Sequence, residues 1–470
     1  MSHPVAVPIP VREPVGARSP WPSFWIASLA VLLVSIDATV LYAAFGALRR
    51  AFAGESAASL SWVLNAYTVT YAAMLVPAGG LADAHGRKRT FLVGASLFII
   101  ASFACGAAPS IELLIAARVV QAIGAALLTP ASLSLILEAF PKEKRAVAVS
   151  LWGAVGGLAA AIGPSLGAWI VDTLGWPWAF YINLPLGAVS VFKGISVLRE
   201  SRGQGRSPHV DVVGMLLLIV SVGGLALAIT QWESRQWNSG ELRLVLLGAG
   251  LSLAAFIMWS GWTRHPLFRL ELFRSPTYSL VNVATLSFAI AFAMMFFAFF
   301  SYMTSIWKFS LPLAGIAITP GPLMVVPVAI ASGKVAARIG HRPGLVLGSL
   351  VYACSGLWLA MVPGTEPAYW TQWFPGLMLS GAGVGMVLPS LSGAAVARLP
   401  QDQYAVGAAI NQAIRQIGSV LGVAVTILLI GHDHLSRIDF KPLYLMHVGL
   451  ALLTGGLCLG VNTRPRAAQG

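Results

Sequence analysis

The sequence predicts an all-helical protein that crosses a membrane about fourteen times. Hydrophobic residues make up 57% of its 470 residues and charged residues only 10%, whereas soluble domains contain roughly 45–50% and 25%. Apolar runs of the length that spans a hydrocarbon core follow one another along the chain. The formal net charge of +13 comes from lysines and arginines that lie mostly in the short loops between these runs. Such residues are typical orientation charges, so no nucleic-acid partner is expected.

The chain opens with residues 1–22, whose prolines and arginines predict a disordered cytoplasmic tail without the layout of a secretory signal. Basic residues then gather in alternate loops, beginning with Arg87, Lys88 and Arg89 after the second span. Because such clusters stay on the cytoplasmic side, they predict a multi-pass protein of the cytoplasmic (inner) membrane with both termini cytoplasmic. The expected spans are residues 24–48, 62–81, 91–108, 113–137, 147–171, 179–198, 212–230, 242–262, 278–307, 313–337, 345–362, 373–396, 406–430 and 443–461.

The turn between the second and third spans carries a motif. It resembles the signature loop of major facilitator superfamily transporters, Gly-x-Leu-Ala-Asp-x-x-Gly-Arg-Lys/Arg, at Gly80, Leu81, Ala82, Asp83, Gly86, Arg87 and Lys88. In a soluble protein the turn would be an ordinary surface loop, but here two spans flank it. The resemblance implies a cytoplasmic latch in which Asp83 meets a helix N-terminus or a guanidinium.

A weaker copy of this turn at residues 333–342, with Ala337 in place of the aspartate, indicates two duplicated halves. The resemblance then implies six-helix bundles at residues 23–198 and 276–462. Two extra spans would lie within residues 199–275, and residues 463–470 would form a cytoplasmic tail. This arrangement resembles the fourteen-helix drug:proton antiporter branch of the superfamily.

Asp37 lies in the middle of the first span, where an ionised carboxylate is costly and needs a cavity, a partner or a proton. Asp37 and Thr39 match the Leu-Asp-x-Thr motif of that branch. The resemblance implies proton coupling for Asp37 and a place in the substrate cavity or along the antiporter helix for Thr39, as it does for Gln121 below. Tyr42 and Gly46 replace the Asn and Pro found later in the motif, so the local cavity differs. The alternative is a structural aspartate that caps a broken helix.

Arg118 and Gln121 in the fourth span match an Arg-x-x-Gln-Gly-x-Gly motif, with Ala122 in place of its first glycine. An arginine does not lose its proton in a protein, so a buried one needs a carboxylate or several carbonyls. The resemblance implies that Arg118 assists proton coupling. A structural pin between helices is equally open.

The fifth span contains Gly157, Gly163, Pro164 and Gly167. Proline kinks a helix, and glycines on one face let a neighbouring helix approach closely. Alone the pattern indicates a kinked helix. Its resemblance to the Gly-Pro motif of the antiporters implies export and not import.

Arg415, near the expected cytoplasmic start of the thirteenth span, lies in a stretch that resembles Asn-x-x-Arg-Gln-x-Gly of the same branch. It is expected to share the latch with Asp83 or, alternatively, to extend to the membrane surface. His432, Asp433 and His434 lack a further Cys/His cluster, so they predict a solvated loop and no metal site. No Walker loop, HExxH motif or nucleophile–base pair is present, so no cofactor, no ATP-driven pump and no enzyme is expected.

These observations together predict a monomeric, proton-coupled antiporter that exports hydrophobic or cationic drugs or metabolites, with protons and the lipid bilayer as its other partners. Glu138 and Asp172, both near helix ends, are candidates for a second proton-binding carboxylate. The alternatives are a transporter of a siderophore, amino acid, lipid or imported solute, and a membrane scaffold or sensor that transports nothing.

Overall fold

The computed structural model describes residues 19–141, 144–202, 210–232, 238–399, 403–430 and 435–463. These residues form helices and connecting loops, with no strand among them. The helices are α1 (Trp21–Ala51), α2 (Ala57–His85), α3 (Arg87–Gly106), α4 (Ile111–Ala139), α5 (Arg145–Leu174), α6 (Trp178–Tyr181), α7 (Asn183–Val197), α8 (Val212–Thr230), α9 (Ser239–Trp262), η2 (Leu270–Arg274), α10 (Pro276–Ser305), α11 (Leu311–Ile318), α12 (Pro320–Ile339), α13 (Arg342–Met361), η3 (Tyr369–Trp373), α14 (Phe374–Val396), α15 (Tyr404–Ile430), η5 (Arg437–Asp439) and α16 (Phe440–Cys458).

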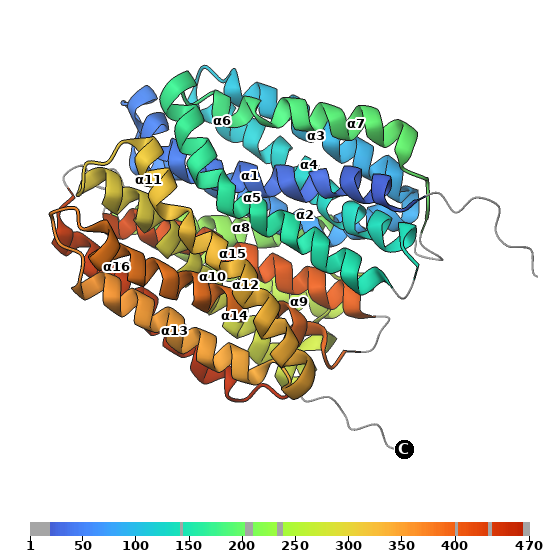
Figure 1. The fold of residues 1–470 in the computed structure, drawn as a ribbon. Coiled ribbons are helices and arrows are strands. Elements are labelled where there is room, and N and C mark those ends of the chain that lie inside the picture. The colour runs from blue at the N-terminus through green and yellow to red at the C-terminus, as the bar shows by residue number, and fades with distance from the viewer. Residues whose placement is uncertain are drawn as a thin grey trace, which may run out of the picture.

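The long helices run side by side in two bundles, with α1 to α7 in the first and α10 to α16 in the second (Figure 1). Two seams join the bundles. At the first seam α5 packs on α11 and α12, and at the second α2 packs on α15. Helix α8 packs on α9 and also on both α2 and α15, so the pair α8 and α9 lies along the second seam.

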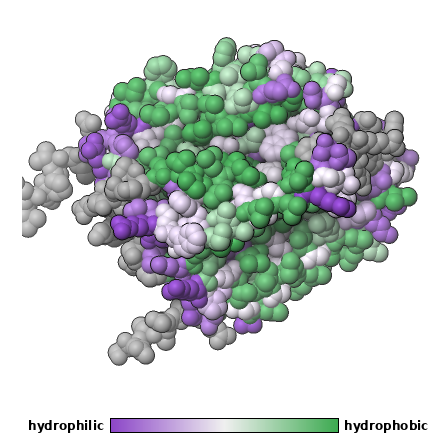
Figure 2. All heavy atoms as spheres, turned by 180° about the vertical axis from the view of Figure 1, so that it is seen from behind, coloured by the Kyte–Doolittle hydropathy of each residue, from purple (hydrophilic) through white to green (hydrophobic). Residues whose placement is uncertain are grey.

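Twelve spans among the described residues are long and apolar enough to cross a membrane. Helices α2 and α5, which have 29 and 30 residues, are not among the twelve. The surface carries an apolar belt across its middle and hydrophilic residues toward both ends (Figure 2). The prediction of an all-helical, multi-pass membrane protein is therefore confirmed, whereas the predicted number of fourteen spans exceeds the twelve that meet these criteria.

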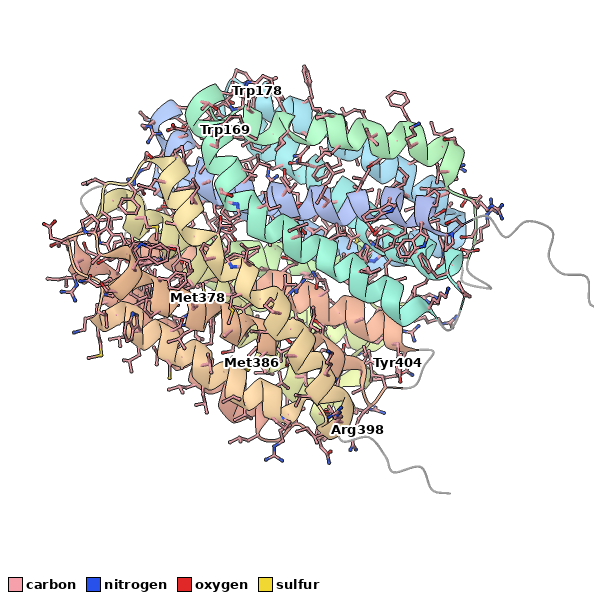
Figure 3. The ribbon with its side chains drawn as sticks, viewed as in Figure 1. Trp169, Trp178, Met378, Met386, Arg398 and Tyr404 are labelled. Atoms are coloured by element: carbon pink, nitrogen blue, oxygen red, sulfur yellow. The ribbon has the colours of Figure 1, made fainter. Side chains whose placement is uncertain are left out.

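Residues at the rims of the belt agree with this arrangement. Trp169 and Trp178 are exposed and lie toward one end of the molecule (Figure 3). Arg398, which follows α14, and Tyr404, the first residue of α15, lie at the opposite end. Tryptophan and tyrosine favour the membrane–water interface, and arginine favours the water beyond it. The belt between these side chains is the part that the bilayer would cover.

The two bundles share more of their apolar core at one end than at the other. At the end where α1 ends and α2 begins, side chains of both bundles form one cluster, in which Phe45 lies 5.0 Å from Phe297 and Tyr42 lies 5.4 Å from Phe296 between ring centroids. At the end where α2 meets α3, the first bundle has a core of its own, built from residues between Phe24 and Leu198. The core of the second bundle includes Val69 and Ala73 of α2 from the first bundle. At the α1–α2 end several helices of the first bundle thus contribute to the shared core, whereas among the described residues of the second bundle's core α2 is the one contributor from the first bundle.

Candidate functional site

Asp37 lies near the middle of α1 and has no exposed surface. Its Oδ2 accepts a hydrogen bond from Arg118 Nη1 at 2.7 Å. Its Oδ1 accepts two more, from Gln121 Nε2 at 2.8 Å and from Asn183 Nδ2 at 2.9 Å. Three donors thus surround the carboxylate, an arrangement that suits an ionised carboxylate because it only accepts hydrogen bonds.

The Arg118 side chain is also buried, and it contacts three further residues besides Asp37. Its Nε donates to the carbonyl oxygen of Val63 in α2 at 3.0 Å, and its Nη1 donates to Gln121 Oε1 at 2.5 Å. The guanidinium carbon lies 3.9 Å from the centroid of the Tyr67 ring, in cation–π geometry. The carboxylate that the sequence requires for Arg118 is therefore Asp37, and the structure brings the three predicted residues Asp37, Arg118 and Gln121 into one buried group.

Two further side chains complete what we call the Asp37 network, which consists of Asp37, Ser102, Arg118, Gln121 and Asn183. Ser102 Oγ accepts from Gln121 Nε2 at 2.8 Å and from Asn183 Nδ2 at 3.4 Å. Sequence reasoning missed Ser102 and Asn183. The available signal was a polar residue inside an apolar run, but such a residue indicates a site only once the facing helices are known.

The Gly-Pro motif of α5 places this helix directly against α1. A Cβ atom added at Gly163 would overlap the side chain of Thr39, and one added at Gly167 would lie 2.8 Å from Val40 Cα. On its other side, the carbonyl oxygen of Pro164 lies 2.8 Å from where a Cβ of Gly315 in α11 would be. Helix α5, which also contains Gly157, is therefore packed between the helix that carries Asp37 and a helix of the second bundle.

The signature loop is an ion-paired turn. Gly86 has a φ of +111°, which favours glycine, and ends α2. Arg87 pairs with Asp83 at 2.9 Å and with Glu138 at 3.1 Å. The Glu138 carboxylate thus binds an arginine at the α2–α3 end. A Cβ added at Gly80 would meet no atom within 4 Å, so packing does not explain that glycine.

Glu200, which sequence reasoning missed, caps α3. Its carboxylate accepts hydrogen bonds from the backbone N–H groups of Lys88 and Arg89, each at 3.1 Å. A Cβ added at Gly86 would overlap this carboxylate. The N-terminus of a helix favours a negative charge. Glu200, in the segment that follows α7, therefore stabilises the signature loop at the start of α3.

The weaker copy of the loop has the same construction. Gly340 has a φ of +85° and ends α12, as Gly86 ends α2. Thr463, which follows α16, accepts a hydrogen bond from His341 N–H at 2.8 Å through its Oγ1. In both bundles the segment after the last helix thus returns to this turn, which supports the internal repeat.

Comparison with protein families matches the chain to the Major Facilitator Superfamily over residues 27–423 and again over residues 281–469. The chain belongs to the Major Facilitator Superfamily. Within it, the chain is 33% identical over 404 residues to the multidrug resistance protein Stp of Mycobacterium tuberculosis, covering 84% of this chain and 73% of that protein. It is 30% identical over 410 residues to the tetracenomycin C resistance and export protein of Streptomyces glaucescens, covering 86% and 75%. These relatives place this major facilitator among the drug-efflux transporters.

The fold agrees with solved structures of the superfamily. An inward-open structure of the xylose transporter XylE from E. coli superimposes with a TM-score of 0.66, at 13% identity, over 96% of this chain and 98% of that one. At this level of identity the likeness concerns the fold alone.

The structure places Arg415 elsewhere than the sequence predicts. It is the twelfth residue of α15, about 16 Å along the axis from the first residue, Tyr404. The prediction that Arg415 lies near the start of its helix is therefore wrong, and in this structure Asp83 pairs with Arg87. The latch role of the signature loop stays a prediction.

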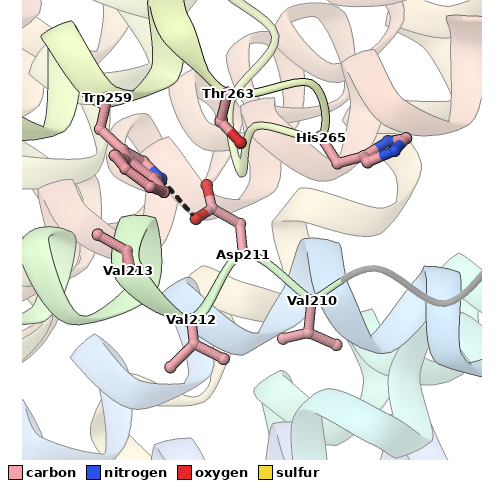
Figure 4. A pocket seen from close by; sticks show the side chains of 7 residues that line it. All are labelled: Val210, Asp211, Val212, Val213, Trp259, Thr263 and His265. Atoms are coloured by element: carbon pink, nitrogen blue, oxygen red, sulfur yellow. Dashed lines mark hydrogen bonds between the residues drawn. The ribbon is translucent and has the colours of Figure 1, made fainter.

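A small pocket at the α2–α3 end lies between α8 and α9 and contains Asp211 (Figure 4). Asp211 accepts hydrogen bonds from Trp259 Nε1, Gly214 N–H and Leu267 N–H, each at 2.8 Å. The carboxylate is thus fully used in joining the two extra helices, so it does not offer a site for cargo. Among the described residues no cluster of three metal-ligating side chains occurs, and residues 432–434 lie outside the described part of the chain.

Proposed function

We propose that this major facilitator is a proton-coupled antiporter that exports a hydrophobic small molecule. The observation that carries the proposal is the Asp37 network. A carboxylate in the middle of a spanning helix is costly, and this one is balanced by a single guanidinium, Arg118. Protonation of Asp37 would remove one charge of that pair and so change the energy of the buried group, which is what a coupling site must do.

Alternating access is supported by the unequal cores of the two ends. The larger shared cluster at the α1–α2 end would close the outside, and the smaller shared core at the α2–α3 end would allow that end to open to the cytoplasm. With α2 and α5 added to the twelve apolar spans, the bundle has fourteen. An even number of spans supports termini on the same side of the membrane, and the basic loop at Arg87 supports the cytoplasm as that side. We propose that the protein acts as a monomer.

The direction of transport and the cargo are supported by similarity. The relatives named above are a multidrug resistance protein and a resistance and export protein. The Gly-Pro helix, packed between α1 and α11, favours export over import. An importer, or a scaffold that transports nothing, is the alternative that the experiment must distinguish.

The test is proton movement on addition of drugs to the purified protein in proteoliposomes. Wild type is compared with Asp37→Asn and with the charge-neutral variant Asp37→Asn/Arg118→Gln, which keeps the buried group uncharged. Drug-evoked proton movement should occur in the wild type and be absent in both variants. Equal movement in the folded double variant would assign the coupling to another residue, and no movement with any of a broad panel of drugs would favour the importer or scaffold.

A further inference from the structure

Arg415 is a second arginine deep in the membrane-spanning part of the molecule. Its depth in α15 sets it apart from the arginines of the loops, and its side chain is partly buried. At about 16 Å from the helix start it lies near the middle of a hydrocarbon core about 30 Å thick, too deep to extend to the membrane surface.

No acidic residue compensates Arg415 in the described part of the chain. Asp37 is the one carboxylate there that lies more than a turn from the end of a spanning helix, and it pairs with Arg118. Arg415 itself makes no ion pair and no side-chain hydrogen bond with described residues. The interior therefore has one positive charge in excess, which is costly without a counterion.

Arg415 lies on a polar face of α15. Gln412, Gln416 and Ser419 are spaced three or four residues from one another or from Arg415, so the four side chains share one side of the helix. All four are partly exposed, although the helix packs between α2, α8 and α10. The side chains of Gln412 and Gln416 make no hydrogen bond with described residues either, so amide donors lie beside the guanidinium.

The polar face is directed toward the first bundle. Helix α15 packs on α2, and the hydroxyl of Tyr71 in α2 donates to Thr129 Oγ1 of α4 at 3.0 Å. Tyr71 in turn stacks on Tyr67, with ring centroids 6.0 Å apart and planes 9° apart, and Tyr67 lies beneath Arg118. Tyr71 and Tyr67 thus connect α2, which packs on the helix that carries Arg415, to the Asp37 network.

We propose that Arg415, with Gln412 and Gln416, binds the carboxylate of an amphiphilic cargo whose apolar part lies along the seam between α2 and α15. A guanidinium binds a carboxylate through two parallel hydrogen bonds, and the adjacent amides supply further donors. This site deepens the proposed export function, on which it rests, by naming an ionic group of the cargo. It replaces the expectation of a cationic cargo, because an uncompensated arginine repels a cation.

The test compares three fluorescent probes that share a dansyl group and an undecyl chain and end in a carboxylate, its methyl ester or a primary amine. Binding is measured by fluorescence titration of the full-length protein in phosphatidylcholine nanodiscs, with empty nanodiscs as the blank. The wild type should bind the carboxylate about ten- to a hundredfold more tightly than the ester, as expected for hydrogen bonds to a charged group. The amine should bind most weakly.

Arg415→Gln should abolish the preference for the carboxylate and leave ester binding unchanged, which also shows that the variant is folded. Arg415→Lys should retain part of the preference, because lysine keeps the charge but not the planar pair of donors. Arg398→Gln, which removes an exposed arginine, is the matched control and should behave as the wild type.

Equal affinity of the wild type for the three probes, or equal loss of ester and carboxylate binding in Arg415→Gln, would overturn the assignment. So would loss of the preference in nanodiscs that contain phosphatidylglycerol, because an anionic lipid would then be the occupant. The titration needs no ion gradient and is independent of Asp37 coupling. Preferential carboxylate binding without drug-evoked proton movement would therefore reject the antiporter and support the Arg415 site. Drug-evoked proton movement without preferential carboxylate binding would reject the Arg415 site alone.

Discussion

Replacing Asp37 by asparagine preserves the shape of the side chain but not its charge, so the structure predicts a large loss of stability. Arg118, whose side chain is only 1% exposed, would be left as a buried charge without a counterion. Breaking one partner of a buried pair costs about 3–5 kcal/mol in the free energy of unfolding. Changing Arg118→Gln as well removes the second charge, so the double variant should be more stable than Asp37→Asn alone. It should remain less stable than the wild type, because glutamine loses the contact with Tyr67.

The assay is equilibrium unfolding of the purified protein in mixed dodecyl sulfate micelles, measured for both single variants and the double variant. The expected coupling energy is about 2 kcal/mol or more, in the sense that the second change offsets part of the first. The control cycle uses Asp83 and Arg87, whose side chains are 29% and 23% exposed and whose pair should contribute at most about 1 kcal/mol. Additive effects of Asp37→Asn and Arg118→Gln, or an effect no larger than the control, would refute the reasoning.

Three further predictions concern the glycines and a loop histidine. Gly163→Ala should destabilise the protein by about 1–3 kcal/mol through overpacking, whereas Gly153→Ala, where a Cβ meets no atom within 4 Å, should not; equilibrium unfolding measures both. Gly86→Ala should lower the thermal unfolding midpoint because its φ is +111° and a carboxylate lies beside it, while Gly80→Ala should leave the midpoint unchanged. Burial lowers the pKa of His341, so the folded state disfavours its protonated form. Stability should therefore fall as pH drops below about 6.5, the ordinary value for histidine, and His341→Gln should reduce that fall in a series of unfolding midpoints.

Each of these has a clear contrary result. Equal effects at Gly163 and Gly153 would mean that the contact between α1 and α5 is looser than the structure shows. Equal effects at Gly86 and Gly80 would mean that neither the positive φ of Gly86 nor the nearby Glu200 carboxylate makes a side chain unfavourable at this turn. A pH profile that is the same with and without His341 would assign the acid sensitivity to other groups.

Charge and hydropathy predicted the membrane class, and two motifs predicted that Asp37 and Arg118 lie within spans, whereas their pairing is seen only in the structure. Asp37, Arg118 and Gln121 could be found because each is a polar residue inside an apolar run. Asn183 and Ser102 carry the same signal, but serine and asparagine in a span are too common to identify a site before the facing helices are known. Glu200 could not be predicted, since its role depends on the chain returning to Gly86 over a hundred residues later. Arg415 was misplaced although the expected span, residues 406–430, begins only two residues from the start of α15, because the expectation that it shares the latch with Asp83 put it near the helix start.

Both seams between the bundles include a helix that contacts the Asp37 network, α5 at the first and α2 at the second. At the first, Thr39 lies two residues from Asp37 and packs on Gly163, and the neighbouring Pro164 carbonyl packs on Gly315 of α11. Because neither glycine leaves room for a side chain, α5 has little freedom to move against α1 without also moving against α11.

At the second seam, Tyr67 and Tyr71 connect Arg118 to α2, which packs on α15, the helix that carries Arg415. We infer that a proton at Asp37 acts on the bundles through the close packing of α5, and that cargo acts through the charge of Arg415. The first action depends on shape and the second on electrostatics. Gly163→Ala should therefore impair transport of charged and uncharged cargo alike, whereas Arg415→Gln should impair transport of the carboxylate alone.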